Sequence, residues 1–213
     1  MTYLKALLGA LIGSAIGGAI WVAIGYFTGY EVGYVAWGLG GLAGIGVAVM
    51  VPERERNIQT SFAAVAVAVC GILASKYLVA SLLVDRELGP QLAMMGSGDS
   101  HLVTLADEVV EEWESNGKKV NWPAGMSLEE AGKEADYPPE IWKEARQRFD
   151  ALPPEQQTAF QEGQKAANAM MADAWMQAAK EETFKNSFSP FDLLFFALAA
   201  MTAFRIGGSP KEG

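Results

Sequence analysis

Residues 7–27 read LLGALIGSAIGGAIWVAIGYF, a run that contains no charged side chain. A helix needs roughly 20 apolar residues to cross the hydrocarbon core of a bilayer, so this run is long enough for a membrane span. Three further stretches have the same character, and we expect a span in each of them: residues 33–51, 62–84 and 191–206. The first run follows Lys5, as in a secretory signal, but it is too long for the apolar core of one. We interpret it as a retained span.

The charged residues divide the chain of 213 residues into three regions. Residues 1–84 hold only seven, whereas residues 85–188 hold 20 acidic and 10 basic side chains. We therefore predict three transmembrane helices in residues 1–84, an acidic helical extramembrane domain in residues 85–188, and a fourth transmembrane helix with a short tail in residues 189–213. The fold class that follows is an all-α polytopic membrane protein with a helical soluble insertion between spans three and four.

Composition excludes several classes of protein. The chain is 51% hydrophobic, carries a formal net charge of −9 and has one cysteine. The long apolar runs exclude an ordinary cytosolic enzyme, and a single cysteine excludes a disulfide scaffold. The charged region is acidic and would repel phosphate, so we expect no nucleic-acid partner.

Four crossings place both termini and the 52–60 loop on one side of the membrane. Basic residues near the span ends favour the cytoplasm for the side that holds more of them. Both termini are therefore expected in the cytoplasm and residues 85–188 outside it. The side expected in the cytoplasm holds the larger number of these residues: Lys5, Arg54, Arg56, Arg205 and Lys211. The opposite side holds Arg86, Lys180 and Lys185.

Glycines at intervals of four residues are concentrated in the first two spans. Residues four apart share one helix face, and the missing side chains leave a groove into which another backbone can settle. These residues are predicted to mediate helix packing: Gly9, Gly13, Gly17, Gly25, Gly29, Gly40 and Gly44. Both contacts within the chain and contacts with another copy or another subunit agree with this pattern. Glycine zippers also resemble those that line small oligomeric channels.

Lys76 is the charged residue within the third span. An ionisable group in hydrocarbon suggests a functional role and requires a partner. Asp192 lies at the start of the fourth span, on the same side of the membrane, and we predict an intramembrane pair of Lys76 with Asp192. Two alternatives are a Lys76 side chain that extends to the lipid headgroups and an Asp192 that serves only the first turn of its own helix.

Local signals predict the helices of the acidic region. The third span is expected to end near Leu88, before Gly89-Pro90. A helix capped by Asp99 or Ser100 should run to Ser115, and the capping box in residues 127–130 should open a short helix. Residues 137–140 should begin another, with Ile141, Trp142, Ala145 and Phe149 facing inward. The last is expected from Pro154 to about Asn186.

One face of that last helix resembles a coiled-coil seam with small residues. Its residues recur in steps of three and four: Phe160, Gln164, Ala167, Met171, Ala174 and Ala178. We predict that this seam contacts a partner. The 100–115 helix of the same chain and a second subunit are the two candidates.

Groupings typical of catalysis are missing from the sequence. It contains no phosphate loop, no C-x-x-C and no H-E-x-x-H, and His101 is the sole histidine. The acidic residues between 107 and 114 are interpreted as a solvated face, with weak divalent-cation binding as the alternative. We expect no catalytic residues, no cofactor and no metal site.

Three segments together resemble uncharacterised bacterial four-span membrane proteins: residues 106–108, residues 137–142, and residues 191–205 with Phe191-Asp192-Leu193-Leu194 and Thr202-Ala203-Phe204-Arg205. The resemblance covers most of the chain and implies a bacterial envelope setting. With the four predicted spans, the expected location is the bacterial inner (cell) membrane, as a multi-pass protein. It implies no activity.

The leading hypothesis is a non-enzymatic integral membrane protein that acts as a structural or accessory subunit or as a self-assembling component. Its partners would be the lipid bilayer and other copies of itself, in a homo-oligomer, or the subunits of a larger membrane complex. The alternative is a small oligomeric channel or transporter in which Lys76 and Asp192 form the intramembrane electrostatic element.

Overall fold

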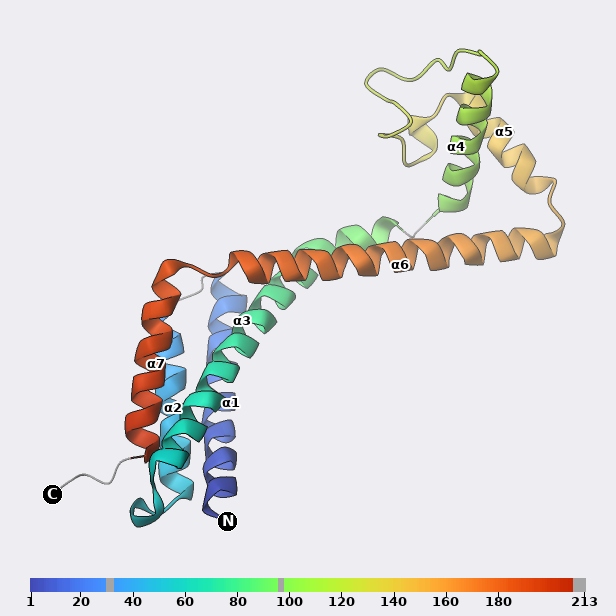
Figure 1. The fold of residues 1–213 in the computed structure, drawn as a ribbon. Coiled ribbons are helices and arrows are strands. Elements are labelled where there is room, and N and C mark those ends of the chain that lie inside the picture. Colours follow the sequence, from blue (N-terminus) through green and yellow to red (C-terminus); the bar gives the residue numbers. More distant parts are fainter. Residues whose placement is uncertain (30–32, 96–97, 209–213) are drawn as a thin grey trace. The chain divides into compact units, whose positions relative to one another are not determined.

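The computed structural model describes residues 1–29, 33–95 and 98–208 (Figure 1). Within these ranges the regular structure is entirely helical. The elements are α1 (Thr2–Thr28), α2 (Gly33–Met50), η1 (Glu53–Glu55), α3 (Ile58–Met95), α4 (Ser100–Ser115), η2 (Glu134–Asp136), α5 (Pro139–Asp150), α6 (Pro154–Asn186) and α7 (Pro190–Gly208).

Four of these helices are long and apolar enough to cross a membrane: α1, α2, the Ile58–Ala93 part of α3, and α7. The predicted all-helical fold with four candidate spans is therefore confirmed. The fourth predicted span of 16 residues lies within a helix of 19. A helix of that length rises about 28 Å at ~1.5 Å per residue, close to the ~30 Å of hydrocarbon.

The chain forms two compact units. The first, called here the bundle unit, consists of residues Met1–Glu87 and Ala178–Gly213; the second, called here the α4–α5 unit, consists of residues Leu88–Gln177. The long helices α3 and α6 each contribute residues to both. The two units are defined by packing within the chain, so the predicted division into membrane and extramembrane regions stays a prediction.

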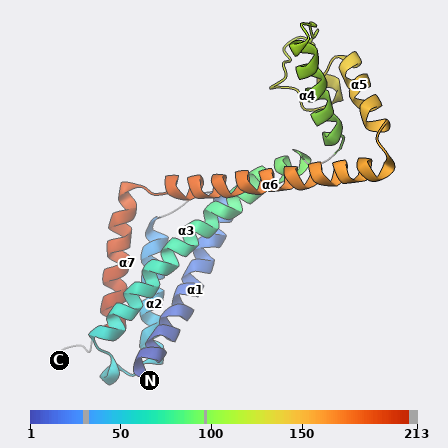
Figure 2. The same ribbon diagram turned by 45° about the vertical axis from the view of Figure 1, so that its right-hand side comes forward.

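In the bundle unit, α1, α2, α7 and the first part of α3 lie side by side (Figures 1 and 2). Its core consists mainly of alanine side chains, such as Ala10, Ala43 and Ala68, with valine next in number. Three hydrogen bonds join elements at one end of the bundle: Thr2 to Glu55, Arg56 to the Ile206 carbonyl, and Thr60 to the Gly207 carbonyl. The start of α1, the α2–α3 connection and the end of α7 therefore share that end, as four crossings require.

The α4–α5 unit has a core of its own, in which α4 packs against α5. Leu102, Ala106 and Val109 of α4 are buried. The four residues of α5 that were predicted to face inward are all buried, which confirms that prediction: Ile141, Trp142, Ala145 and Phe149.

The predicted end of the third helix near Leu88 is wrong. The helix continues through Gly89 and Pro90 to Met95. Pro90 removes one backbone donor, and its ring opposes the carbonyl four residues earlier, but a single proline can lie inside a long helix when the turns on both sides hold it. Gly89 is not among the glycines with positive φ, so it does not form the left-handed cap that the Gly-Pro pair suggested.

The predicted short helix after residue 126 is also wrong. The capping-box residues form a single turn, in which the Glu130 and Ala131 amides donate to the Ser127 carbonyl. The Ser127 hydroxyl donates to the carboxylates of Glu129 and Glu130 and so is not the acceptor that a capping box supplies to the third amide of a helix.

Candidate functional site

Lys76 is a buried cation in the middle of α3, with only 1% of its side chain exposed. Its Nζ donates to the Ser187 carbonyl at 3.0 Å and lies 3.6 Å from Oδ1 of Asp192. The structure thus brings together the two residues that were predicted to pair. The Ser187 carbonyl, which belongs to the connection between α6 and α7, was not foreseen, because no sequence pattern marks a carbonyl as a lysine acceptor.

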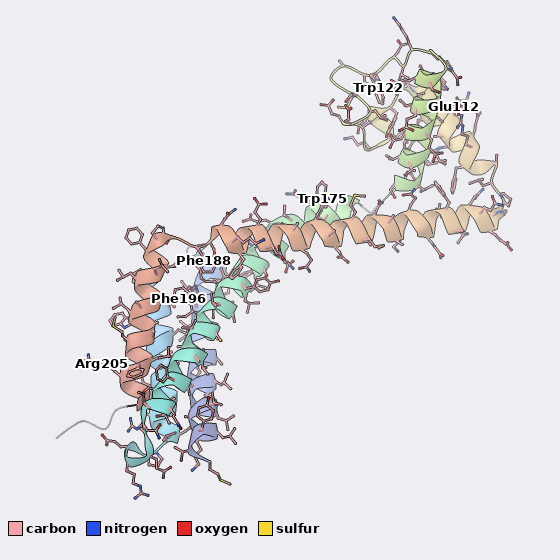
Figure 3. All side chains as sticks on the ribbon, viewed as in Figure 1. Glu112, Trp122, Trp175, Phe188, Phe196 and Arg205 are labelled. Carbon is pink, nitrogen blue, oxygen red and sulfur yellow. The ribbon has the colours of Figure 1, made fainter. Side chains whose placement is uncertain are left out.

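Aromatic rings enclose the same ammonium group. The Nζ atom lies 5.1 Å from the centre of the Phe188 ring and 6.0 Å from that of Trp21. Both distances fall within or at the limit of a cation–π contact. Figure 3 labels Phe188 at the end of the bundle where α7 begins. The rings replace part of the hydration that burial removes from the ammonium.

Asp192 has a second partner directly before its own helix. The Ser189 amide donates to Oδ2 of Asp192 at 2.6 Å, directly before α7 begins. A carboxylate in this position satisfies an unpaired backbone donor and interacts favourably with the positive end of the helix. The ion pair with Lys76 and the local role at the start of the helix, stated above as alternatives, therefore occur together.

The glycines of α1 lie against neighbouring backbones. A Cβ atom on Gly9 would overlap the Gly46 carbonyl, and one on Gly13 would overlap the Leu42 carbonyl, both in α2. Gly17 faces Leu39 of α2, and Gly25 faces Val79 of α3. These glycines therefore serve contacts within the chain, which is the first of the two interpretations given above.

In α2 the glycines face a different helix. A Cβ on Gly40 would overlap the backbone of Ala199, and one on Gly44 would meet Ile206 at 2.8 Å, both in α7. Gly29 departs from the predicted packing role: nothing lies within 4 Å of its Cβ position, and its φ of +70° makes it the left-handed cap of α1.

Several packing residues were absent from the predicted set. Gly46 meets Gly9, and Gly71 meets the Ser14 side chain. Gly207 and Gly208, at the end of α7, approach Ala64 and Ser61 of α3. The four-residue spacing does not find them, because none of them has another glycine four residues away in the sequence.

A polar contact crosses the core of the α4–α5 unit. The Tyr137 hydroxyl donates to Oδ1 of Asp107 at 2.5 Å. Burial raises the pKa of the Asp107 carboxyl, while the hydrogen bond from Tyr137 acts in the opposite direction. Burial and the same hydrogen bond raise the pKa of Tyr137, which moves the phenol still further from ionisation at neutral pH.

A second polar cluster lies nearer the surface of that unit. Arg148 donates to Glu112 at 2.7 Å and to Glu144 at 2.6 Å, and these hydrogen bonds raise the pKa of the guanidinium group. The indole of Trp113 donates to Glu144 as well. The cluster ties α4 to α5. Among the residues that the structure describes, no three histidine, cysteine or acidic side chains are placed to hold a metal ion.

The predicted seam of α6 divides into two parts. Phe160 packs with Phe149 beside the core of the α4–α5 unit. Ala167, Met171, Ala174 and Ala178 are exposed. We call the exposed apolar residues that share one face of α6 between 167 and 175 the α6 stripe: Ala167, Met170, Met171, Ala174 and Trp175, the last of which is labelled in Figure 3.

The chain matches no family model, no curated protein and no solved structure. The resemblance to bacterial four-span membrane proteins therefore stays a prediction.

Proposed function

We propose that this chain is a non-enzymatic integral membrane protein that acts as a structural or accessory subunit, or assembles with itself, through a helical extramembrane domain. The α6 stripe carries the proposal. Met170 is 74% exposed and Trp175 59% exposed, in a helix without a single fully buried residue. Contiguous exposed apolar side chains are typical of interaction surfaces, because their transfer out of water is favourable.

The arrangement of the bundle unit supports the same proposal. Gly9, Gly13 and Gly40 meet backbones of the same chain, so the principal glycine contacts are already occupied. Lys76 is held by the Ser187 carbonyl and Asp192, an arrangement that joins α3 to α7. The bundle is thus suited to anchoring, and the α6 stripe to contact with a partner.

The first experiment measures the mass of the full chain in mild detergent. We expect an assembly larger than one chain, and we expect Met171→Glu to reduce it to the monomer, because a carboxylate in an apolar contact pays a desolvation penalty. Ala169→Glu is the matched control: it adds the same charge at an exposed position of α6, two residues or about 160° around the helix from Met171.

A strict monomer at every concentration, with no subunit that purifies with it, would contradict the proposal. Equal assembly of the Met171→Glu and Ala169→Glu variants would show that the protein assembles through a surface other than the α6 stripe.

We further propose that the protein resides in a bacterial inner membrane with both termini in the cytoplasm and residues 85–188 outside. Thiol labelling of intact cells tests this in a Cys70→Ser background. A cysteine at Lys119 should react with a membrane-impermeant maleimide, whereas one at Arg54, in the α2–α3 connection, should react only after lysis. Lys119 is exposed, and it is a better labelling position than the nearby Gly117, whose φ of +72° disfavours a side chain. The reverse pattern would invert the orientation.

A further inference from the structure

A groove of about 1060 Å³ lies on the surface of the bundle unit between α1 and α3. Small side chains line it on both helices, among them Ala15 and Ala19 of α1 and Cys70 and Ala74 of α3. At its floor Gly18 and Gly71 lie next to Ser75 and Ser14, which brings the two helices close together. The groove exists because the helices touch through glycines while the residues above them are too small to fill the space.

The groove is apolar and long. Along α1 it extends from Leu11 to Phe27, and along α3 from Ala66 to Leu82. Sixteen residues of helix rise about 24 Å at ~1.5 Å per residue, more than the ~15 Å of one leaflet. Its lining faces the region that hydrocarbon occupies around a membrane span, so an alkyl chain matches it in both polarity and length.

A cation lies at one end of this groove. Leu78, Leu82 and Arg86 follow at intervals of four residues in α3 and so share one helix face. The Arg86 Nη1 donates to the Tyr26 carbonyl at 2.9 Å, and the guanidinium lies 5.3 Å from the centre of the Tyr26 ring. Tyr26 itself lines the groove. Tyrosine at the end of a span is typical of the headgroup level.

Arg86 is accessible to a ligand there. Its side chain is 45% exposed, and its Nη2 lies 3.8 Å from Oε1 of Glu87, which is 71% exposed. An exposed pair at that distance contributes little free energy. The neighbouring Asp85 is paired with Lys180 at 2.7 Å. A phosphate group can therefore replace the weak contact with Glu87 and accept two parallel hydrogen bonds from the guanidinium.

We propose that the α1–α3 groove binds one glycerophospholipid, with an acyl chain along Ala19 and Ala74 and the phosphate at Arg86. The charge of Arg86 selects this occupant over a second protein helix, since an apolar helix has no anion to place against the guanidinium. The site is independent of the α6 stripe and of the function proposed above.

Native mass spectrometry of the full chain, delipidated in mild detergent and titrated with phosphatidylglycerol, tests the site. We expect one lipid bound per chain. Arg86→Gln removes the phosphate contact and Ala19→Phe fills the groove, so each should weaken binding at least tenfold. Arg54→Gln and Gly38→Phe are the matched controls and should bind as the wild type does, because Arg54 lies in the α2–α3 connection and Gly38 has open space around it.

Cys70 provides a second measurement within the groove, where it is exposed. Bound lipid should slow its reaction with a membrane-permeant maleimide, and Arg86→Gln should restore the rate. Two results would overturn the proposal. One is wild-type lipid affinity in both groove variants while circular dichroism shows them folded. The other is dimers cross-linked through Cys70 on mild oxidation in the presence of lipid, which would identify a second copy as the occupant.

Discussion

Asp192→Asn is expected to destabilise the bundle unit by about 3–5 kcal/mol, the cost of leaving one member of a buried ion pair without its counter-ion. The substitution keeps an oxygen that can accept from the Ser189 amide, so the start of α7 retains its cap. The substitution removes the negative charge opposite the Lys76 ammonium, and the Lys76 side chain is only 1% exposed. Unfolding of the full chain in mixed micelles, followed by circular dichroism, measures the loss.

Lys76→Met should cost less, about 1–3 kcal/mol. Methionine fills similar volume beside Phe188 and Trp21, and Asp192 keeps its bond from Ser189 and some exposure to solvent. The double variant Lys76→Met/Asp192→Asn should recover most of the stability that Asp192→Asn loses, since an uncharged pair is often as stable as a buried ionic one. Strict additivity of the two single losses would show that the residues do not interact.

Gly13→Ala is expected to destabilise the protein by about 1–3 kcal/mol through overpacking between α1 and α2. The new Cβ atom would overlap the Leu42 carbonyl, and a backbone atom cannot move aside as a flexible side chain would. The two helices must therefore separate along part of their length. The same unfolding measurement in micelles tests this.

Gly38→Ala is the matched control for this prediction. It makes the same substitution inside α2 at a position with nothing within 4 Å of the added atom. It should stabilise the protein slightly, by up to ~1 kcal/mol, because alanine is the better helix former. If the Gly13→Ala and Gly38→Ala variants have the same free energy of unfolding, close backbone contact does not hold α1 against α2.

The ion-pair prediction and the glycine prediction differ in how much of each follows from the sequence. The pairing of Lys76 with Asp192 follows from counting crossings, which predicts that both residues lie on one side of the membrane. The Ser187 carbonyl that completes the contact depends on how the chain turns between α6 and α7, and no residue type marks that geometry. The spacing of the glycines predicted packing but left the partner open, since both interpretations require the same bare helix face.

The sequence by itself determined the four candidate spans, the start of α5 and the bounds of α6, because these depend on the length of apolar runs and on prolines and caps within a few residues. Where a neighbouring interaction competes with such a local signal, the prediction failed, as at Pro90 and at Ser127. Only the tertiary structure decided that Gly9 meets Gly46, that Gly40 meets Ala199, and that the α6 stripe is exposed. Those outcomes depend on the fit between surfaces far apart in the chain, and that fit exists only once the helices have packed.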